Sequence, residues 1–158
     1  MEGAKSKMYS YERIYVAVDG SKEADYAFDK AVGICSRNEG STLTAIHVFN
    51  RGYQVGISEV SDKTLVESQN ERSNQIVDYY KNKAKDYGIP CEVKLKEGLP
   101  SSTLLAEFKA LTPNDLVVCG SSNLGRLAKL FVGSVSNDLV NRSSCDVLVV
   151  RTPEIHRT

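Results

Sequence analysis

The sequence predicts an α/β protein in which helices cover both faces of a parallel sheet. Five short runs rich in β-branched and other apolar residues alternate with four segments of helical apolar spacing. One of these runs, residues 116–119, is wholly apolar, which is typical of a strand buried on both sides of a parallel sheet. Such alternation produces right-handed βαβ units, so we predict a three-layer sandwich with a five-stranded parallel sheet.

The first part of the chain predicts two strands joined by a helix. Residues 13–18 are β-branched and aromatic, as in a strand. Ser21 is a good N-cap for the next helix, whose apolar residues recur at helical spacing as far as Cys35 and which Gly40 ends. Residues 43–49 then predict the second strand.

The middle of the chain predicts a loop, a long polar helix and an edge strand. Residues 50–60 contain two glycines and are assigned to the loop. The helix should run from about residue 61 to residue 87. Residues 91–96 alternate between apolar and charged side chains, which indicates a half-buried strand at the sheet edge. The apolar stripe of the helix is clear only in its later part, at Ile76, Tyr80, Ala84 and Tyr87.

The last part repeats the strand and helix alternation. Pro100 or Ser101 should begin a helix, and residues 112–114 should end it. Residues 116–119 form the next strand, Gly133 and Ser134 open the last helix, and residues 146–150 form the last strand. The apolar positions of the helix that begins near Pro100 are Leu104, Leu105, Phe108 and Leu111.

Length, charge and hydropathy bound the domain count and argue against nucleic acid or a membrane as the partner. A chain of 158 residues fits one domain, which we place at residues 11–152 between a disordered tail at 1–10 and a short polar tail at 153–158. Lys and Arg total 20, as do Asp and Glu, so no basic excess favours nucleic acid as a partner. No apolar run approaches the roughly 18 residues of a membrane span, and we expect no membrane partner.

The cysteines indicate a reducing compartment, so the cytoplasm is the expected location. None of the four forms a C-x-x-C pair, and the chain has only two histidines, so a zinc site is not expected. Each cysteine lies among apolar residues, as buried free thiols do. They are Cys35, Cys91, Cys119 and Cys145.

The segment at residues 115–136 carries the main functional signal. Gly120 ends the apolar strand, small, polar and basic residues follow, and Gly133 and Ser134 then open a helix. Backbone N–H groups at a helix start lack internal partners, and the helix dipole is positive there, so a phosphate can bind them directly. Glycine lets the backbone approach a ligand closely.

A second candidate site converges on this segment. In open α/β sheets, ligands bind beyond the carboxyl ends of the strands where the strand order changes direction. The first and fourth strands are the expected neighbours at that point, which brings Asp19 opposite Gly120. Asp19 can accept hydrogen bonds from ribose hydroxyls, or it can instead bond to loop amides. Ser134 and Ser136 equally suit a helix cap.

The spacing in this segment resembles the signature of the universal stress protein family. That signature is Gly, two residues, Gly, nine residues, Gly, then Ser or Thr, and here Asn123 takes the place of the middle Gly. The resemblance extends to Val-Ala-Val-Asp-Gly-Ser at residues 16–21 and to residues 144–151. It implies a sheet of order 3-2-1-4-5 and binding of ATP or AMP with Mg²⁺. The apolar edge strand at residues 146–150 also predicts a homodimer, as the resemblance implies, unless Ile155 and the C-terminal tail fold back over that edge.

The same resemblance implies which residues meet the nucleotide. Arg126 and Lys129 could also close over the phosphates as point charges, although solvated loop charges are the usual alternative. The implied contacts are Ala17, Val18 and Asp19 with the adenosine, Val48 with the adenine, Cys119 and Gly120 with the ribose and phosphates, and Asn123, Gly133, Ser134, Val135 and Ser136 with the phosphate end.

Binding is favoured over catalysis. The Walker A sequence Gly-x-x-x-x-Gly-Lys-Ser/Thr is absent, and no set of metal-binding carboxylates is evident. His47 has no nucleophile close to it in sequence. The prediction is therefore a regulatory nucleotide-binding protein acting as a stress sensor or switch. The alternatives are a slow ATPase on the same pocket, and an interaction module that no longer binds a nucleotide.

Overall fold

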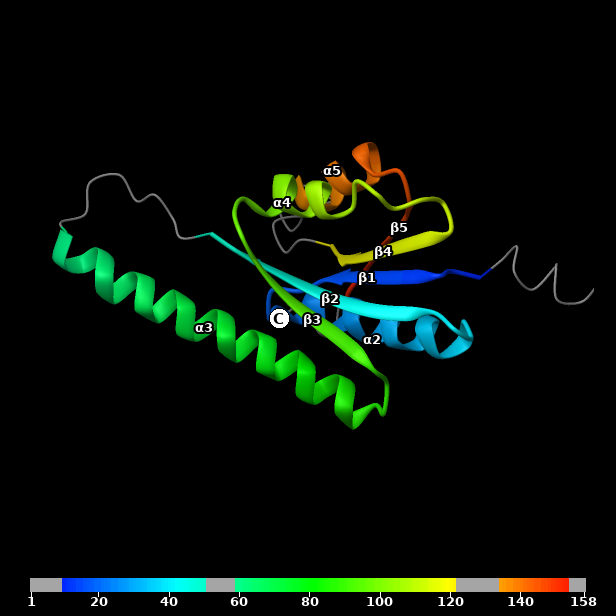
Figure 1. Cartoon of the computed structure of the whole chain (residues 1–158), viewed down its shortest axis with the longest axis horizontal. Helices are drawn as coiled ribbons and strands as arrows, with labels where there is room; N and C mark the ends of the chain where they lie inside the picture. Colours follow the sequence, from blue (N-terminus) through cyan, green and yellow to red (C-terminus); the bar gives the residue numbers. More distant parts are fainter. Residues whose placement is uncertain (1–9, 51–58, 122–133, 154–158) are drawn as a thin grey trace, which may run out of the picture.

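The computed structural model describes residues 10–50, 59–121 and 134–153, with backbone alone for residues 59–66. A five-stranded sheet of order β3-β2-β1-β4-β5 forms its centre, and every strand pair is parallel (Figure 1). This confirms the predicted fold class and strand order. The strands are β1 (Arg13–Ala17), β2 (Thr42–Phe49), β3 (Cys91–Glu97), β4 (Asp115–Gly120) and β5 (Asp146–Val150).

Helices cover both faces of this sheet. On one face lie α2 (Lys22–Arg37) and α3 (Glu59–Asp86), and on the other lie α4 (Pro100–Glu107) and α5 (Ser134–Arg142) (Figure 1). The crossovers after β1, β2 and β4 lead to the adjacent parallel strand, whereas α4 carries the chain from β3 across to β4 beside β1. The result is the expected three-layer sandwich, with β1 and β4 at its centre.

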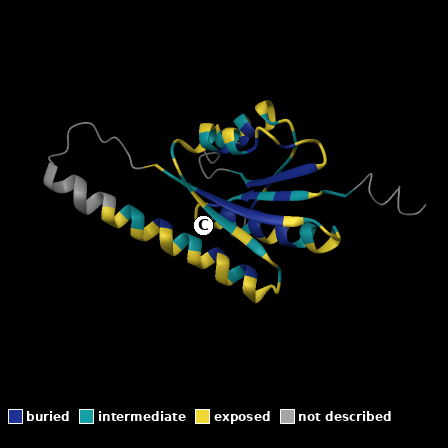
Figure 2. Ribbon diagram, in the orientation of Figure 1, coloured by how far each residue is buried: buried dark blue, intermediate teal, exposed yellow. Residues whose placement is uncertain are grey.

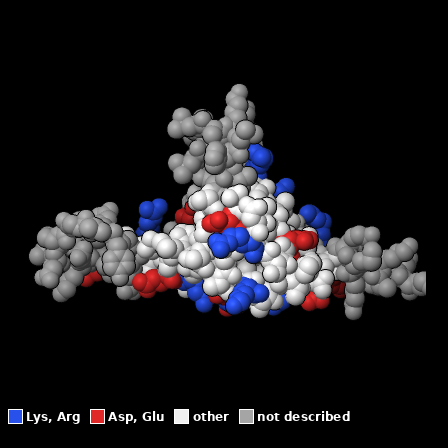
Figure 3. All heavy atoms as spheres, turned by 90° about the horizontal axis from the view of Figure 1, so that it is seen from above, with Lys and Arg blue, Asp and Glu red and all other residues white. Residues whose placement is uncertain are grey.

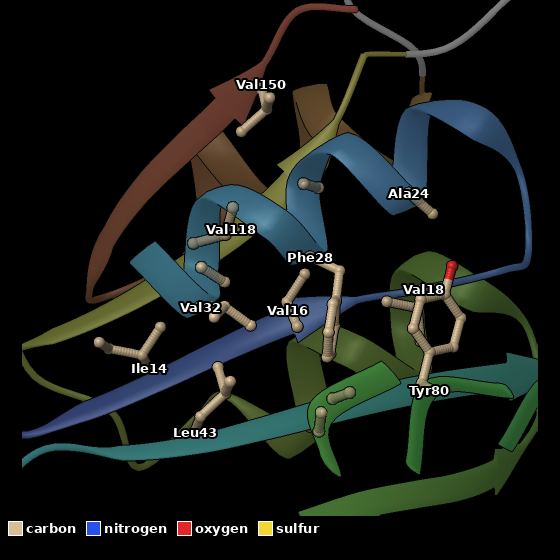
Figure 4. Packing of buried hydrophobic residues seen from close by; sticks show 14 of the residues in the cluster. Ile14, Val16, Val18, Ala24, Phe28, Val32, Leu43, Tyr80, Val118 and Val150 are labelled. Carbon is tan, nitrogen blue, oxygen red and sulfur yellow. The ribbon is translucent and has the colours of Figure 1, made fainter. Parts of the chain in front are cut away.

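The two faces of the sheet build two separate cores. Alternate residues of the central strands point to opposite faces, so Val16 and Val118 face α2 and α3 while Val117 faces α4 and α5. In the first core, Phe28 of α2 and Tyr80 of α3 pack side by side, with ring centroids 5.1 Å apart (Figure 4). β4 and most of β2 are buried, whereas β3 is half-buried or exposed and α3 exposes much of its outer side (Figure 2). Each residue of β4 from its first to its fifth position is buried, as predicted for a central strand.

Hydroxyl groups dock the long helix α3 onto α2. The hydroxyls of Tyr79 and Tyr80 both donate to Asp25, each over 2.9 Å. Tyr87 donates to Asp29 over 2.8 Å, and the Lys83 ammonium lies 3.0 Å from the same carboxylate. These contacts explain how a helix with a largely polar sequence can be held against its neighbour.

Most of the predicted helix ends are confirmed. The Ser21 hydroxyl accepts a hydrogen bond from the N–H of Ala24 and caps α2, and Pro100 occupies the first turn of α4. Two details were wrong. The α4 helix ends at Glu107, so Leu111 reaches the core from the turn that follows, and Tyr87 is exposed because its hydroxyl reaches Asp29 at the helix surface.

The cysteine prediction holds for one residue and fails for three. Cys119 is buried in β4, whereas Cys35, Cys91 and Cys145 are half-buried because they lie at the margins of the two cores. Within the described residues, no helix is both long and apolar enough to cross a membrane. On the face seen in Figure 3, Lys and Arg are interspersed with Asp and Glu, so neither sign forms a single patch there.

An ion pair between the buried carboxylate of Asp115 and the partly exposed Arg13 joins the starts of the two central strands. Both oxygens of Asp115 accept from the Arg13 guanidinium, over 2.9 and 2.8 Å, and the N–H of Thr112 also donates to this carboxylate over 2.9 Å. Burial raises the pKa of Asp115, but the hydrogen bonds from Arg13 and Thr112 outweigh it and hold the pKa below its ordinary value. Arg13 pairs with Asp115 in the β1–β4 register, so the ion pair helps fix this alignment.

We predict that Asp115→Asn destabilises the protein at neutral pH by about 2 kcal/mol, since it removes charge-assisted hydrogen bonds at a buried site. Because the pKa of Asp115 is lower in the native state than in the unfolded state, its ionised carboxylate stabilises the fold at pH values above the unfolded-state pKa of about 3.9. This stabilisation is lost as the pH falls through the native pKa. Urea unfolding of the variant should therefore depend less on pH below about 4. The exposed Asp86→Asn is the control, and an equal loss in both variants would contradict the prediction.

Candidate functional site

A cavity of about 360 Å³ opens at the carboxyl ends of β1 and β4. The sheet order changes direction there, because the chain steps outward from β1 to β2 and β3 on one side and from β4 to β5 on the other. Its volume falls in the range of small-molecule sites. The lining residues are Ala17, Val18, Asp19, Ser21, Glu23, Ala24, Ile46, Val48, Pro100, Leu104, Cys119, Gly120, Ser121, Ser134, Val135 and Ser136.

The turn after β1 supplies a carboxylate to the cavity. The N–H of Ser21 donates to Oδ1 of Asp19 over 2.9 Å, and the turn contains Gly20 with φ of 81°. Asp19 therefore bonds to a loop amide, as one interpretation of the sequence expected, and it also lines the cavity. No described residue bonds to its second oxygen, which can accept hydrogen bonds from a ligand.

The end of β4 brings two helix starts together. A Cβ at Gly120 would lie 2.7 Å from the carbonyl oxygen of Glu23, so only glycine permits α2 to approach this strand so closely. On the α5 side, the hydroxyl of Ser136 donates to the carbonyl of Gly120 over 2.9 Å. The first turns of both α2 and α5 thus meet at one residue.

The neighbouring residues make one wall apolar. Val48 and Ile46 come from β2, and Pro100 and Leu104 come from α4. Burial raises the pKa of the Cys119 thiol, which therefore stays protonated at neutral pH. This wall suits a flat apolar group, while the opposite end offers hydroxyls and the N–H groups of a helix start.

His47 supports the site without lining it. Its ring is buried, and Nδ1 lies 2.9 Å from the carbonyl oxygen of Val18. Because a carbonyl only accepts, Nδ1 carries the proton in this bond. The contact ties β2 to the end of β1, which agrees with a structural role for this histidine.

The structure brings most of the predicted site residues together. The residues Asn123, Arg126, Lys129 and Gly133 lie outside the described part of the chain. Within the parts described, no group of three or more His, Cys, Asp and Glu side chains could hold a metal ion. The predicted residues that do line the cavity are Ala17, Val18, Asp19, Val48, Cys119, Gly120, Ser134, Val135 and Ser136.

Sequence reasoning missed several lining residues. Pro100 and Leu104 reach the cavity because α4 covers the β2 side of the switch point, and helical spacing alone does not show which end of a helix meets a ligand. Glu23 follows a helix cap and resembles an ordinary acidic residue in a first helical turn. The remaining missed residues are Ser21, Ala24, Ile46 and Ser121.

The sequence matches the profile of the universal stress protein family over residues 10–151. A Staphylococcus saprophyticus protein that carries the universal stress protein name is 38% identical over 150 residues, covering 94% of this chain and 88% of its relative. The chain belongs to the universal stress protein family. This confirms the resemblance that the Gly120 segment indicated.

Solved structures agree with this assignment. The universal stress protein UspA from Lactobacillus plantarum superposes with a TM-score of 0.75 and 26% identity, covering 90% of this chain and 99% of that one. A universal stress protein solved in complex with cAMP gives a TM-score of 0.64 and 27% identity, covering 91% and 99%. The fold and the location of the switch point are therefore shared with this family.

We predict that Gly120→Ala destabilises the fold by about 1–3 kcal/mol, because its new methyl group would press on the Glu23 backbone and α2 would have to move. The matched control is Gly33→Ala inside α2, where the added carbon would meet only the end of Arg37 at 3.6 Å. That change should be neutral or stabilise by up to about 1 kcal/mol. Thermal unfolding of both variants tests this, and equal midpoints would contradict it.

Proposed function

We propose that this universal stress protein binds an adenine nucleotide, ATP or AMP, in the cavity between β1 and β4, and that it acts as a regulatory sensor or switch in the cytoplasm. The observation that carries the proposal is the cavity itself. It combines an apolar wall, a carboxylate at Asp19 and the start of α5 at the point where open α/β sheets bind ligands.

The chemistry of the cavity orients the proposed ligand. The adenine lies against Val48 and the ends of β1, with the ribose between Asp19 and Gly120. The phosphates approach Ser134 and Ser136, where N–H groups of the first helical turn and the helix dipole favour negative charge. A related structure that contains cAMP supports an adenine nucleotide as the ligand class. Mg²⁺ enters the proposal as the counter-ion of the ATP phosphates.

Regulation is preferred to rapid turnover. Fast phosphoryl transfer uses a lysine that reaches the phosphates and carboxylates that hold Mg²⁺. The sequence lacks the Walker A lysine. A bound nucleotide can still change the protein if it stabilises one arrangement of the residues around it, since a ligand shifts an equilibrium by its differential affinity.

We predict that Ala17→Phe abolishes nucleotide binding while the protein stays folded, because a phenyl ring at this lining position fills much of the cavity. Titration calorimetry with AMP and with Mg²⁺-ATP should show binding to the unmodified protein and at least a tenfold weaker signal for the variant. Ala110→Phe places the same side chain at an exposed position and is the control. No binding to the folded unmodified protein would overturn the proposed function.

The proposal includes a homodimer formed through β5. This strand is an edge of the described sheet, where its one partner strand is β4. The N–H of Ser121 donates to the carbonyl of Val150 over 2.9 Å, so the polar backbone groups of Val150 point towards β4. Because this direction alternates along a strand, the N–H and carbonyl of Val149 point away from β4 towards the outer edge of the described sheet, where we propose that a second copy pairs. An antiparallel pairing across a two-fold axis would close the assembly.

We predict that Val149→Pro weakens the dimer much more than the fold, because it removes an N–H that faces outward rather than towards β4. Val149→Ala keeps that N–H and is the matched control. Light scattering at high micromolar concentration should show monomer for the proline variant and dimer for the alanine variant. Monomeric unmodified protein under these conditions would contradict the proposed assembly.

A further inference from the structure

We propose that Glu23 determines which adenine nucleotide the cavity accepts, favouring a monophosphate over metal-free ATP through repulsion of the additional phosphates. The inference rests on the proposed function and deepens it. Glu23 lies in the first turn of α2 and lines the cavity together with Gly120 and Ser121. Its exposed fraction is 7%, which is low for a carboxylate.

The position of Glu23 relative to the proposed phosphate end is fixed by Gly120. A Cβ at Gly120 would lie 2.9 Å from the Cβ of Glu23, so the glutamate lies directly against the end of β4. The first turn of α5 reaches the same residue, through the hydrogen bond from Ser136 to the Gly120 carbonyl. Glu23 and the start of α5 are thus neighbours across one residue.

Unlike the other acidic residues at this end of α2, Glu23 has no bonding partner within the described parts of the chain. Asp19 accepts from the N–H of Ser21, and Asp25 accepts from Tyr79 and Tyr80. Among the residues that the structure describes, the Glu23 carboxylate makes neither a hydrogen bond nor an ion pair. The residue is largely buried yet lines the cavity, so its unbonded carboxylate is available to what the cavity holds.

That role follows from charge. The start of α5 attracts the first phosphate group, whereas each further phosphate adds negative charge close to the Glu23 carboxylate. Two like charges a few ångströms apart repel strongly in a partly buried site. Mg²⁺ is commonly held by one or two carboxylates together with substrate phosphates, so its presence would relieve this repulsion. The cavity should therefore accept AMP, or Mg²⁺-ATP, more readily than ATP alone.

The test is titration calorimetry of AMP and ATP, each in EDTA and in excess Mg²⁺, with the unmodified chain, Glu23→Gln and Glu39→Gln. Glu39 is exposed beyond the opposite end of α2, so its variant makes the same change in net charge far from the cavity. In EDTA, Glu23→Gln should strengthen ATP binding about tenfold and change AMP binding less than about threefold. The increase in ATP affinity on adding Mg²⁺ should be smaller in Glu23→Gln than in the unmodified chain. Glu39→Gln should behave like the unmodified chain.

The outcomes separate the two proposals. The role of Glu23 would be overturned if Glu23→Gln changed the dissociation constants of AMP and ATP by the same factor. It would also be overturned if Glu39→Gln changed the dissociation constant of ATP as much as Glu23→Gln does. Either result would leave nucleotide binding itself intact. Weaker AMP binding in Glu23→Gln would also overturn the role of Glu23, since the carboxylate would then be accepting hydrogen bonds from the ligand. No binding of any nucleotide to the unmodified chain and its variants would overturn both proposals. Unfolding midpoints of all three proteins establish that each is folded at the titration temperature.

Discussion

The close approach of α2 to the end of β4 is the constraint on which the site depends. No side chain stands between Gly120 and the backbone of Glu23, so the first turn of α2 lies directly on the strand. The same glycine accepts the hydroxyl of Ser136 through its carbonyl, which holds the start of α5. A larger residue at this position would separate the two helix starts and widen the space between them. The cavity is therefore a product of packing at one backbone position, and the polar groups around it are placed by that packing.

The sequence predicted the architecture and the central part of the site because both depend on local patterns. Alternating strands and helices determine a parallel sheet, and the switch-point rule brings Asp19 and Gly120 together although they are far apart in the chain. The contribution of Leu104 could not be predicted, since apolar spacing shows that a helix face is buried but not which residues meet a cavity. Similarly, an acidic residue in a first helical turn is normally solvated, so nothing in the local pattern around Glu23 indicated its burial.

The α3 helix shows how a polar sequence can be docked without a continuous apolar stripe. Tyr80 inserts its ring into the core beside Phe28 and keeps its hydroxyl on Asp25. The same Asp25 also accepts from Tyr79, so one carboxylate of α2 organises two aromatic residues of α3. The predicted stripe identified Tyr80 and Ala84 correctly, but an amphipathic tyrosine can equally lie at the surface, as Tyr87 does.

The pairing of β1 with β4 also bears on how the chain folds as it is synthesised. Val16 lies opposite Val118, so one edge of β1 has no partner until residues far along the chain have been made. A shorter nascent chain could already pair β1 with β2 and β2 with β3, since these contacts join successive strands. It would then present an unpaired strand that is buried in the finished protein, a feature that promotes association with other chains. Contacts between distant residues form slowly, so arrival of β4 is the step that both covers this edge and creates the cavity.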